Sequence, residues 1–364
     1  MTLEDLRRQL DTLDQQLLTI IAERQALGTE IARAKREAGL PTRDFGRERE
    51  VLLKARDKAQ QLGVPAALGE AVMQLLIRSS LTTQEREQVA AQGQGTGRTA
   101  LVIGGAGKMG LWFSRFLAAQ GYTVTVADPK WAIDGFAYLP NWQADALQHD
   151  LIVVATPINT SNEVLLELAK RAPRGVVFDL GSLKTPLRAG LTALRQAGVR
   201  VTSVHPMFGP DTDLLSGRHV IFIDLGDAQS LQLAQSLFAS TMAEQVVMSL
   251  DEHDRLIAYV LGLSHALNIS FFTALANSGE HAQRLASLSS TTYDAQIAIA
   301  SKVSKENPEL YFEIQRLNEY GQESLTALQK AVNQLIDSVN RNDVSAFKTI
   351  MLQGREYLAG RTKD

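Results

Sequence analysis

The chain has 364 residues, of which 45% are apolar and 21% charged, and it carries a formal net charge of −3 and no cysteine. This length and composition predict a globular protein of about two or three domains. Because 37 basic residues are balanced by 40 acidic ones, there is no basic excess to bind nucleic acid, and the lack of cysteine excludes disulfides, zinc–thiolate sites, iron–sulfur clusters and a thiol nucleophile.

The N-terminal segment is charged and has no long apolar run. MTLEDLRRQLD does not contain the apolar core of a signal peptide. No stretch of the chain approaches the roughly 18 consecutive apolar residues of a membrane span. We therefore expect a soluble, cytoplasmic protein with no membrane partner.

Residues 3–38 are predicted to form one long helix. Apolar residues recur at alternating steps of three and four from Leu3 to Ala34, and the pattern ends at residues 39–41. Such a helix is roughly 54 Å long, whereas a compact domain of about 100 residues has a radius of gyration near 13 Å. The rest of a domain of this size cannot cover it, so we expect an interlocked homodimer.

Two further helical patterns, at 44–61 and 66–88, complete an all-α domain over residues 1–90. Residues 91–98 hold three glycines and no apolar anchor, which is typical of a linker. Strand and helix patterns then alternate, which predicts a doubly wound α/β domain over 99–250 with a parallel sheet. Residues 251–364 are predicted to form an all-α domain. The expected strands lie at 99–104, 122–127, 151–155, 175–180, 199–204 and 219–224.

The first strand of the α/β domain runs into a glycine-rich turn that opens a helix. Gly105, Gly107 and Gly110 form the spacing GxGxxG, with Met109 inside it, and Asp128 ends the second strand 18 residues later. Glycines permit a tight turn and close approach of a pyrophosphate to a helix N-terminus. An acidic residue at that position suits a ribose 2′-hydroxyl and repels a 2′-phosphate. The pattern predicts an NAD site.

Ligands of open α/β sheets bind beyond the carboxyl ends of the strands. We expect three loops to face the nicotinamide, namely those with Thr156–Pro157, with Ser182 and Lys184, and with His205. His205 is the strongest catalytic candidate, because imidazole can accept a proton near neutral pH while hydride leaves the same carbon. The alternative is a structural histidine fixed by Pro206. Lys184 either acts electrostatically on the substrate or is a solvated loop charge.

Two cations lie on the apolar stripe of the first helix. Arg24 occupies a position that the apolar series predicts to be buried, and Lys35 follows Ile31 by four residues. Long stems can carry such charges to water, but a buried unpaired cation is costly, so we expect an anion beside them. Arginine is suited to bidentate binding of carboxylates. We interpret the pair as part of a pocket for a small dicarboxylate.

Residues 1–90 resemble the all-helical chorismate mutases in the segments LRRQLD, AERQ, RAKRE, RDFGRERE and SSLTTQ. The resemblance implies that three arginines, the first from the partner chain, hold two carboxylates. Lys35 and Gln84 would hydrogen-bond the ether oxygen, where negative charge grows as the bond breaks, and Glu48 with Asp44 would bind the ring hydroxyl. The implied pocket residues are Arg7, Arg24, Lys35, Asp44, Arg47, Glu48, Ser80 and Gln84.

Residues 99–360 resemble the prephenate dehydrogenases in VIGGAGKMG, DLGSLK, HPMFGPD and the LSS…Y run. The resemblance implies oxidative decarboxylation of prephenate with NAD and without a metal. His205 would take the proton of the C4 hydroxyl, Ser182 would orient that hydroxyl or the histidine, and Lys184 would assist electrostatically. Feedback inhibition by tyrosine, with His265 near that site, is a further implication. The whole arrangement resembles the bifunctional enzymes of tyrosine biosynthesis that act on chorismate and prephenate.

Two positions in the substrate half depart from that pattern. Lys302 stands where the family has an arginine that clamps the ring carboxylate, and Asp294 stands where an arginine is common. An extra acid would suit a cationic amino group, so 4-amino-4-deoxyprephenate (with 4-amino-4-deoxychorismate for the mutase) and arogenate are alternative substrates. A direct Asp294–Lys302 pair is doubtful, since eight residues of helix separate their Cα atoms by about 12 Å. We favour prephenate.

Two other classes of function compete with the bifunctional enzyme. In one, the helical module is a ligand sensor or dimer clamp for a dehydrogenase. In the other, a hydroxy-acid dehydrogenase carries an unrelated helical module. The intact mutase-type residue set argues against both, because a mere clamp has no need of buried cations.

Overall fold

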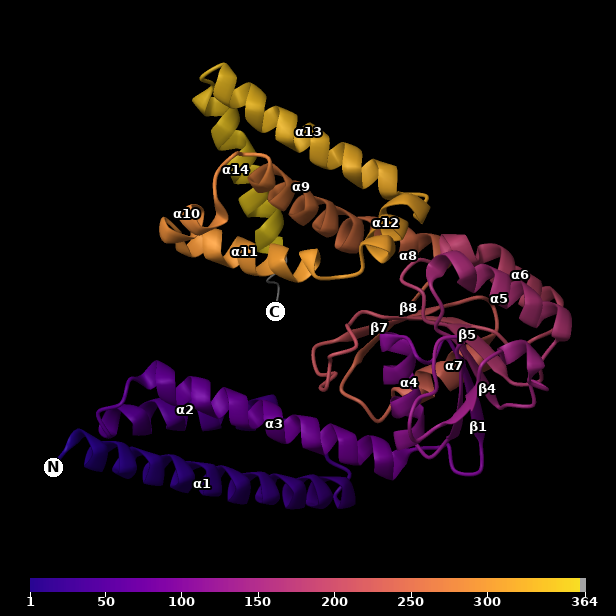
Figure 1. Ribbon diagram of the computed structural model, residues 1–364, viewed down its shortest axis with the longest axis horizontal. Coiled ribbons are helices and arrows are strands. Elements are labelled where there is room, and N and C mark those ends of the chain that lie inside the picture. Colours follow the sequence, from indigo (N-terminus) through magenta and orange to yellow (C-terminus); the bar gives the residue numbers. More distant parts are fainter. Residues whose placement is uncertain (361–364) are drawn as a thin grey trace. The chain divides into compact units, whose positions relative to one another are not determined.

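A computed structural model describes residues 1–360 (Figure 1). The chain forms two compact units. The first unit comprises residues 1–156, 163–181 and 191–248, so it holds the N-terminal helices together with the nucleotide-binding sheet. The second comprises residues 157–162, 182–190 and the helical part from residue 249 onward. The domain boundaries expected from sequence remain predictions.

The first unit begins with three helices: α1 (Leu3–Glu37), α2 (Phe45–Gln61) and α3 (Ala66–Gln92). Thr2 and Asp5 form a capping box at the start of α1, and the Asp44 carboxylate accepts a hydrogen bond from the backbone N–H of Arg47 at the start of α2. Helix α3 packs against both other helices. Gly28 lies opposite Ser80, where an added Cβ would lie 3.3 Å from the serine oxygen, so glycine lets α1 and α3 approach closely.

The long apolar stripe of α1 is only partly covered. Within this helix, only Gly28 and Ala32 are buried. The large apolar side chains of the stripe are 45–66% exposed: Leu3, Leu6, Leu10, Leu13, Leu17, Leu18, Ile20, Leu27 and Ile31. A single copy of the chain therefore leaves this stripe without a partner, as the length of the predicted helix required.

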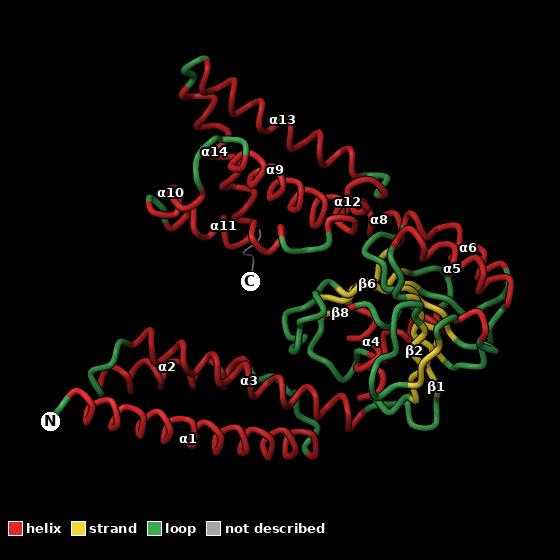
Figure 2. Tube along the Cα trace, in the orientation of Figure 1, coloured by secondary structure: helices red, strands yellow, loops and turns green. Residues whose placement is uncertain are grey.

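Five parallel strands form a sheet in the order β3-β2-β1-β4-β5. Strands are yellow in Figure 2, where β1 and β2 of this sheet are labelled. Their bounds are β1 (Thr99–Ile103), β2 (Thr123–Ala127), β3 (Ala137–Leu139), β4 (Leu151–Val154) and β5 (Val176–Asp179). Strand β3 was not predicted. The strand order reverses between β1 and β4, which is where ligands bind in this architecture. The associated helices are α4 (Lys108–Ala119), α5 (Ile158–Arg171) and α6 (Arg188–Gln196), with the 3₁₀ turns η1 (Trp142–Ala144) and η2 (Thr185–Leu187).

The later strands make a separate mixed sheet, in contrast to one continuous parallel sheet. It contains β6 (Ser203–Pro206), β7 (His219–Ile223) and β8 (Glu244–Met248), with α7 (Ala228–Leu237) between β7 and β8. Strands β6 and β7 are antiparallel because a loop over 207–218, with no crossover helix, joins them, whereas β7 and β8 are parallel. Residues 199–202, predicted as strand, contribute only one bridge, at Val201.

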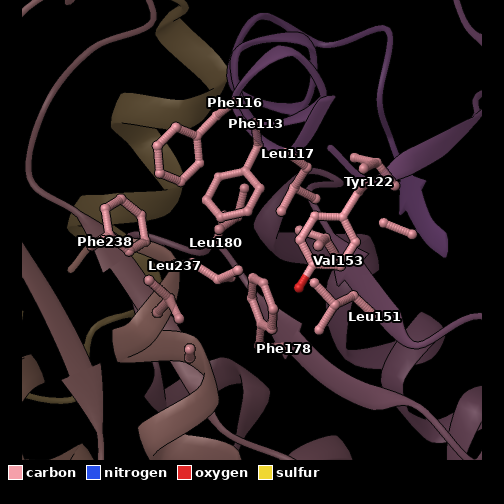
Figure 3. Close-up of a cluster of buried hydrophobic side chains, with 14 of the residues drawn as sticks. Phe113, Phe116, Leu117, Tyr122, Leu151, Val153, Phe178, Leu180, Leu237 and Phe238 are labelled. Carbon is pink, nitrogen blue, oxygen red and sulfur yellow. The ribbon is translucent and has the colours of Figure 1, made fainter. Parts of the chain in front are cut away.

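A cluster of phenylalanines joins the two sheets (Figure 3). Phe113 of α4 lies edge-on to Phe178 of β5, with ring centroids 5.7 Å apart. Phe238 lies 4.9 Å from Phe116 and 5.9 Å from Phe222 of β7, measured between centroids. Such buried aromatic pairs contribute large apolar area and a specific geometry. They therefore hold the mixed sheet against the nucleotide-binding sheet.

The glycine-rich segment after α3 packs against the α/β domain. Its second glycine, Gly95, is buried, and its N–H donates to the carbonyl of Gln120 at the end of α4. A Cβ on Gly93 would lie 2.4 Å from that carbonyl oxygen, and one on Gly95 would lie 2.3 Å from the ring of Tyr122. Two of the three glycines that predicted a flexible linker, Gly93 and Gly95, thus serve close packing, whereas Gly97 has a φ of +78° and open space around it.

The second unit is helical from residue 249 onward. Its helices are α8 (Leu250–Ile257), α9 (Ser264–Ala276), α10 (Ala282–Ser287), α11 (Thr291–Ser304), α12 (Pro308–Leu317), α13 (Gly321–Asn340) and α14 (Val344–Ala359), with a π-helical turn η3 (Ala258–Leu263) between α8 and α9. The continuous stretch Leu250–Ala276 is long and apolar enough to span a membrane by length and composition alone. That is weak evidence, because helices of soluble proteins satisfy the same criterion.

Candidate functional site

A cavity of about 250 Å³ lies among the three N-terminal helices. Seven of the eight pocket residues expected from sequence line it, and apolar side chains such as Ile31 and Val51 complete the wall. The seven are Arg24, Lys35, Asp44, Arg47, Glu48, Ser80 and Gln84. The two cations of the apolar stripe therefore face a common cavity, as the charge argument predicted.

Arg24 is half-buried and held by α3. Its Nη1 donates to the Ser80 hydroxyl at 3.2 Å and to the carbonyl of Leu76 at 3.3 Å. The Ser80 hydroxyl donates in turn to Gln25, at 2.8 Å. Burial lowers the pKa of Arg24 from its ordinary value, although an arginine remains charged at any physiological pH. No carboxylate is paired with Arg24 among residues 1–360, so an anionic ligand would complete its surroundings.

Lys35 and Gln84 supply the hydrogen-bonding groups of the cavity. The ammonium of Lys35 donates to the carbonyl oxygen of Thr42 at 2.8 Å, which leaves it further protons to donate. Gln84 is 8% exposed, and its side-chain oxygen has no hydrogen-bond partner within the described part of the chain. A buried polar group without a partner is costly, and a polar ligand would satisfy it.

The acidic side of the cavity has contacts that the sequence did not predict. Glu48 accepts two hydrogen bonds from Arg43, both at 2.9 Å. Asp44 caps α2, and Arg47 is largely exposed and pairs with Glu50 at 2.6 Å. Arg43 was not predicted as a site residue, although its position five residues before Glu48, across the start of a helix, is the signal that could have identified it.

Arg7 is the one expected pocket residue that does not line this cavity. It lies near the start of α1 and is exposed. The resemblance to chorismate mutases implies that Arg7 belongs to the pocket of a partner chain, and that assignment remains a prediction.

The nucleotide-binding turn has the backbone geometry that the fingerprint predicts. Gly110 packs so closely that a Cβ would lie 2.2 Å from the carbonyl oxygen of Gly104. Gly104 was not predicted as part of this turn. Its φ is +83°, and an added Cβ would lie 2.7 Å from the carbonyl oxygen of Ala155. Met109 is half-buried, and α4 begins directly after Gly107. Free N–H groups at that helix start suit a pyrophosphate.

Asp128 lies immediately after β2 and faces the turn. Its carboxylate accepts hydrogen bonds from the N–H groups of Ala106 at 3.2 Å and of Lys130 at 3.0 Å, and it is 7% exposed. A fixed acid at this place fits a ribose with two free hydroxyls. The residues of this chain therefore suit a dinucleotide without a 2′-phosphate. Thr156, half-buried, follows β4 at the other side of the strand-order reversal, and Pro157 comes next in the chain.

His205 lies within a strand, whereas the sequence analysis placed it in a loop. It is the third residue of β6, pairs in register with Ile221 and is 4% exposed. On the same strand the hydroxyl of Ser203 donates to the buried Asp179, at 2.5 Å, and so ties β6 to the end of β5. Asp179 was not predicted, since a strand-end aspartate in DLGSLK has no distinctive spacing.

The second unit contains the end of the DLGSLK segment, from Ser182 onward, where Lys184 is fully buried. This excludes the alternative that Lys184 is a solvated loop charge. Its backbone N–H and that of Thr185 donate to Asp254, which also accepts from the Thr185 hydroxyl and lies 2.6 Å from Nδ1 of His253. Burial raises the pKa of Asp254, but the hydrogen bonds from His253 and Thr185 outweigh it and lower that pKa. Ser182 is half-buried. Asp254 escaped prediction because its partners are about 70 residues away in sequence.

The remaining predicted residues lie in the helices of the same unit. His265 stacks on Tyr311 with ring centroids 4.1 Å apart, and burial lowers the pKa of His265 to about 4. Asp294 and Lys302 are both exposed on the continuous helix α11, and Asp294 accepts a hydrogen bond from Ser289. No ion pair joins Asp294 to Lys302 in the described residues, so both charges remain available to a ligand.

Three family profiles match the chain. Residues 6–85 match chorismate mutase type II. Residues 135–247 match the nucleotide-binding domain of prephenate dehydrogenase, and residues 249–353 match its dimerization domain. The order of the matches is the order in which the folded modules follow one another in the chain.

The chain is also similar to known proteins over most of its length. A T-protein of Enterobacter agglomerans is 28% identical over 94% of this chain and 89% of its own length, and a T-protein of Haemophilus influenzae is 24% identical over 95% and 89%. A 4-amino-4-deoxyprephenate dehydrogenase of Streptomyces pristinaespiralis is 28% identical over 71% of this chain and 90% of its own. A crystal structure of prephenate dehydrogenase from A. aeolicus, solved with hydroxyphenyl propionate and NAD+, shares the fold, with a TM-score of 0.55, 19% identity, and coverage of 73% of this chain and 98% of that one.

Proposed function

We infer the roles of individual residues from one premise: the chain belongs to the family of bifunctional chorismate mutase–prephenate dehydrogenases. It rearranges chorismate to prephenate and oxidises prephenate to 4-hydroxyphenylpyruvate and CO₂ with NAD. The observation that carries the first role is the cavity that gathers Arg24, Lys35 and Gln84.

In the mutase cavity, the proposed catalysis rests on position and charge. Chorismate rearranges without a nucleophile, so the protein has only to hold a compact conformer and stabilise the separating charges. Arg24 and Arg47 would hold the carboxylates, together with Arg7 of the partner subunit. Lys35 and Gln84 would donate to the ether oxygen as negative charge grows there.

The other end of the substrate would meet the acidic side of the cavity. Glu48 would accept a hydrogen bond from the ring hydroxyl, with Asp44 beside it. Ser80 would act through Arg24, because its hydroxyl accepts a hydrogen bond from the Arg24 guanidinium. These assignments follow the positions of the side chains around one cavity and the chemistry of the substrate.

In the dehydrogenase half, His205 is the proposed acceptor of the C4 hydroxyl proton. NAD supplies the hydride acceptor when it is bound at the turn with Gly105, Gly107 and Gly110. Loss of the ring carboxylate as CO₂ makes the ring aromatic, which drives the reaction without a metal. Ser182 would orient the hydroxyl or the histidine. Lys184 would act electrostatically on the substrate, since burial shields it from water and charges interact more strongly away from water.

We propose that the working form is a homodimer located in the cytoplasm. The exposed apolar stripe of α1 supports a partner chain in the mutase module. Apolar residues exposed on α13 and α14, among them Val339, Phe347 and Met351, support a second contact in the matched dimerization domain. Tyrosine as a feedback inhibitor, with His265 near its site, belongs to the same proposal.

Lys302 and Asp294 are the residues on which the two alternatives for the oxidised substrate depend. Lysine keeps the positive charge of the family's arginine but not its planar bidentate grip, and an exposed aspartate suits a cationic amino group. Purified full-length protein should be assayed for NADH formation with prephenate, arogenate and 4-amino-4-deoxyprephenate. We expect the highest kcat/KM with prephenate. A higher value for either amine would transfer the assignment to that substrate.

A further inference from the structure

Arg43 joins the acidic wall of the mutase cavity to the nucleotide-binding domain. Its Nε and Nη2 donate to the two carboxylate oxygens of Glu48, each at 2.9 Å, and its Nη1 donates to the Ser216 hydroxyl at 2.5 Å. Its guanidinium carbon also lies 4.2 Å from the ring centroid of Phe45. All of these residues belong to the first unit. The guanidinium is therefore fixed on three sides.

Ser216 belongs to the loop over residues 207–218, which follows the His205 strand. Helix α3 holds the same loop at a second point. Glu85, 4% exposed, accepts hydrogen bonds from the N–H groups of Leu215 at 2.7 Å and of Met242 at 2.5 Å. Its neighbour Gln84 lines the mutase cavity. Adjacent residues of one helix thus contact the ligand cavity and the dehydrogenase loop.

A second cavity, of about 480 Å³, lies where these elements meet. It is lined by Arg43 and Ser216, and it shares Glu48, Ile77 and Leu81 with the mutase cavity. Glu48 therefore stands in the wall between the two spaces. Without its pair with Arg43, which lines the second cavity, the flexible Glu48 side chain would have room to turn out of the mutase cavity.

We propose that Arg43 is a positioning residue for the mutase reaction, and that Ser216 of the nucleotide-binding domain completes its geometry. A bidentate arginine–carboxylate pair fixes both the place and the plane of the carboxylate. Glu48 and Arg43 are 19% and 29% exposed, so the pair is only partly screened by water. The dehydrogenase loop is in this sense a structural part of the mutase site. The inference rests on the proposed role of Glu48.

The test compares mutase kinetics of the full-length protein and four variants. We expect Ser216→Ala to lower the mutase kcat about two- to fivefold, because it removes one hydrogen bond of Arg43 and leaves the pair with Glu48 in place. Arg43→Ala should lower it roughly ten- to a hundredfold, with a smaller change in KM, because a misplaced group costs rate more than binding. Arg43→Lys should fall between wild type and Arg43→Ala, and added guanidinium ion should partly restore Arg43→Ala.

Asp213→Ala is the matched control. Asp213 lies in the same loop and pairs with Arg86 of α3 at 2.7 Å, but both side chains are exposed and neither touches Glu48. Exposed pairs of this kind contribute little, so this variant should keep the wild-type kcat. The Kd for NAD and the Tm establish that each variant is folded.

The outcomes separate the hypotheses. If Ser216→Ala and Asp213→Ala have the same mutase kcat, the proposal that Ser216 of the nucleotide-binding domain completes the mutase site is wrong. An Arg43→Ala variant with unchanged kcat, or one that is folded but not restored by guanidinium, also overturns the proposal. A wild-type protein without mutase activity would instead contradict the proposed function itself.

Discussion

The two catalytic halves of this chain place their polar groups in opposite ways. In the helical module, the cations lie on the apolar faces of long helices and converge on a cavity. In the dehydrogenase half, His205 is 4% exposed inside a strand and Lys184 is fully buried in a loop. A charged residue that interrupts the apolar face of a helix can be recognised from the spacing of the apolar residues around it. A polar residue in a short buried strand or loop cannot, because such a segment is too short to show a period. The following predictions test this contrast.

The largest expected effect concerns His205. His205→Asn should lower dehydrogenase kcat by about 10²–10⁴-fold, the typical contribution of a positioned general base. NADH formation from prephenate is the readout. Mutase activity of the same protein should be unchanged, because the mutase cavity does not include this strand. A parallel loss of both activities would indicate that the variant is misfolded and leave His205 without a catalytic assignment.

Lys35→Ala should have the corresponding effect on the mutase reaction of the helical module. Removing a group aimed at developing charge costs about 2.7–4 kcal/mol, so the mutase rate should fall several hundredfold. Disappearance of chorismate is the readout, and oxidation of supplied prephenate should remain normal. Lys54→Ala, which removes an exposed lysine paired with Glu50, is the control and should retain wild-type rates. A decrease of less than about tenfold in Lys35→Ala would count against its role.

Gly107→Val tests the cofactor turn. A Cβ there would lie 3.2 Å from the carbonyl oxygen of Gly104 and at the start of α4. The added side chain should weaken NAD binding by at least about tenfold, since close backbone approach is the purpose of the glycine. Calorimetry measures the Kd. Gly354→Ala, at a helical site with open space around it, should bind NAD normally. Equal affinities would remove this turn from the NAD site.

The smallest expected effect is the pH dependence of stability from His265. Burial lowers its pKa from 6.5 to about 4, so between these values the unfolded chain binds a proton that the folded chain does not. The stability that depends on neutral His265 is therefore present above pH 6.5 and lost as the pH falls toward 4. From pH 7 to pH 5, the Tm of wild type should decrease by a few degrees more than that of His265→Gln. Parallel decreases would show that His265 titrates normally.

The sequence predicted the fold well where hydrophobic periodicity was long. The helix ending at Glu37, the helices on either side of the Gly63 turn and the first strands were all placed within a few residues. Short elements were missed, because three residues such as Ala137–Leu139 do not establish a period. The antiparallel pairing of β6 with β7 was also missed, since no periodic signal distinguishes a loop that reverses the chain from a crossover.

The candidate sites show the same division. Arg24 and Lys35 were found because their spacing along the first helix determines which face they occupy, whereas Gln84 was found only through the resemblance to chorismate mutases. Asp254 was not found, because Lys184, the partner that reveals it, comes from a distant segment. Arg43 was also missed, although Glu48 follows it by only five residues. The glycine-rich segment at 91–98 is ambiguous for a related reason: glycine provides both flexibility and close packing, and only the neighbouring backbone decides which applies.

The most direct test of the central claim, that one chain carries two separate and consecutive active sites, is a progress curve with chorismate and NAD as the only substrates. Wild type should form prephenate transiently and then NADH. A mixture of Lys35→Ala and His205→Asn proteins should form both products, whereas neither variant alone should complete the sequence at more than a small fraction of the wild-type rate. NADH formation by Lys35→Ala alone at the wild-type rate, or none by wild type, would contradict the account.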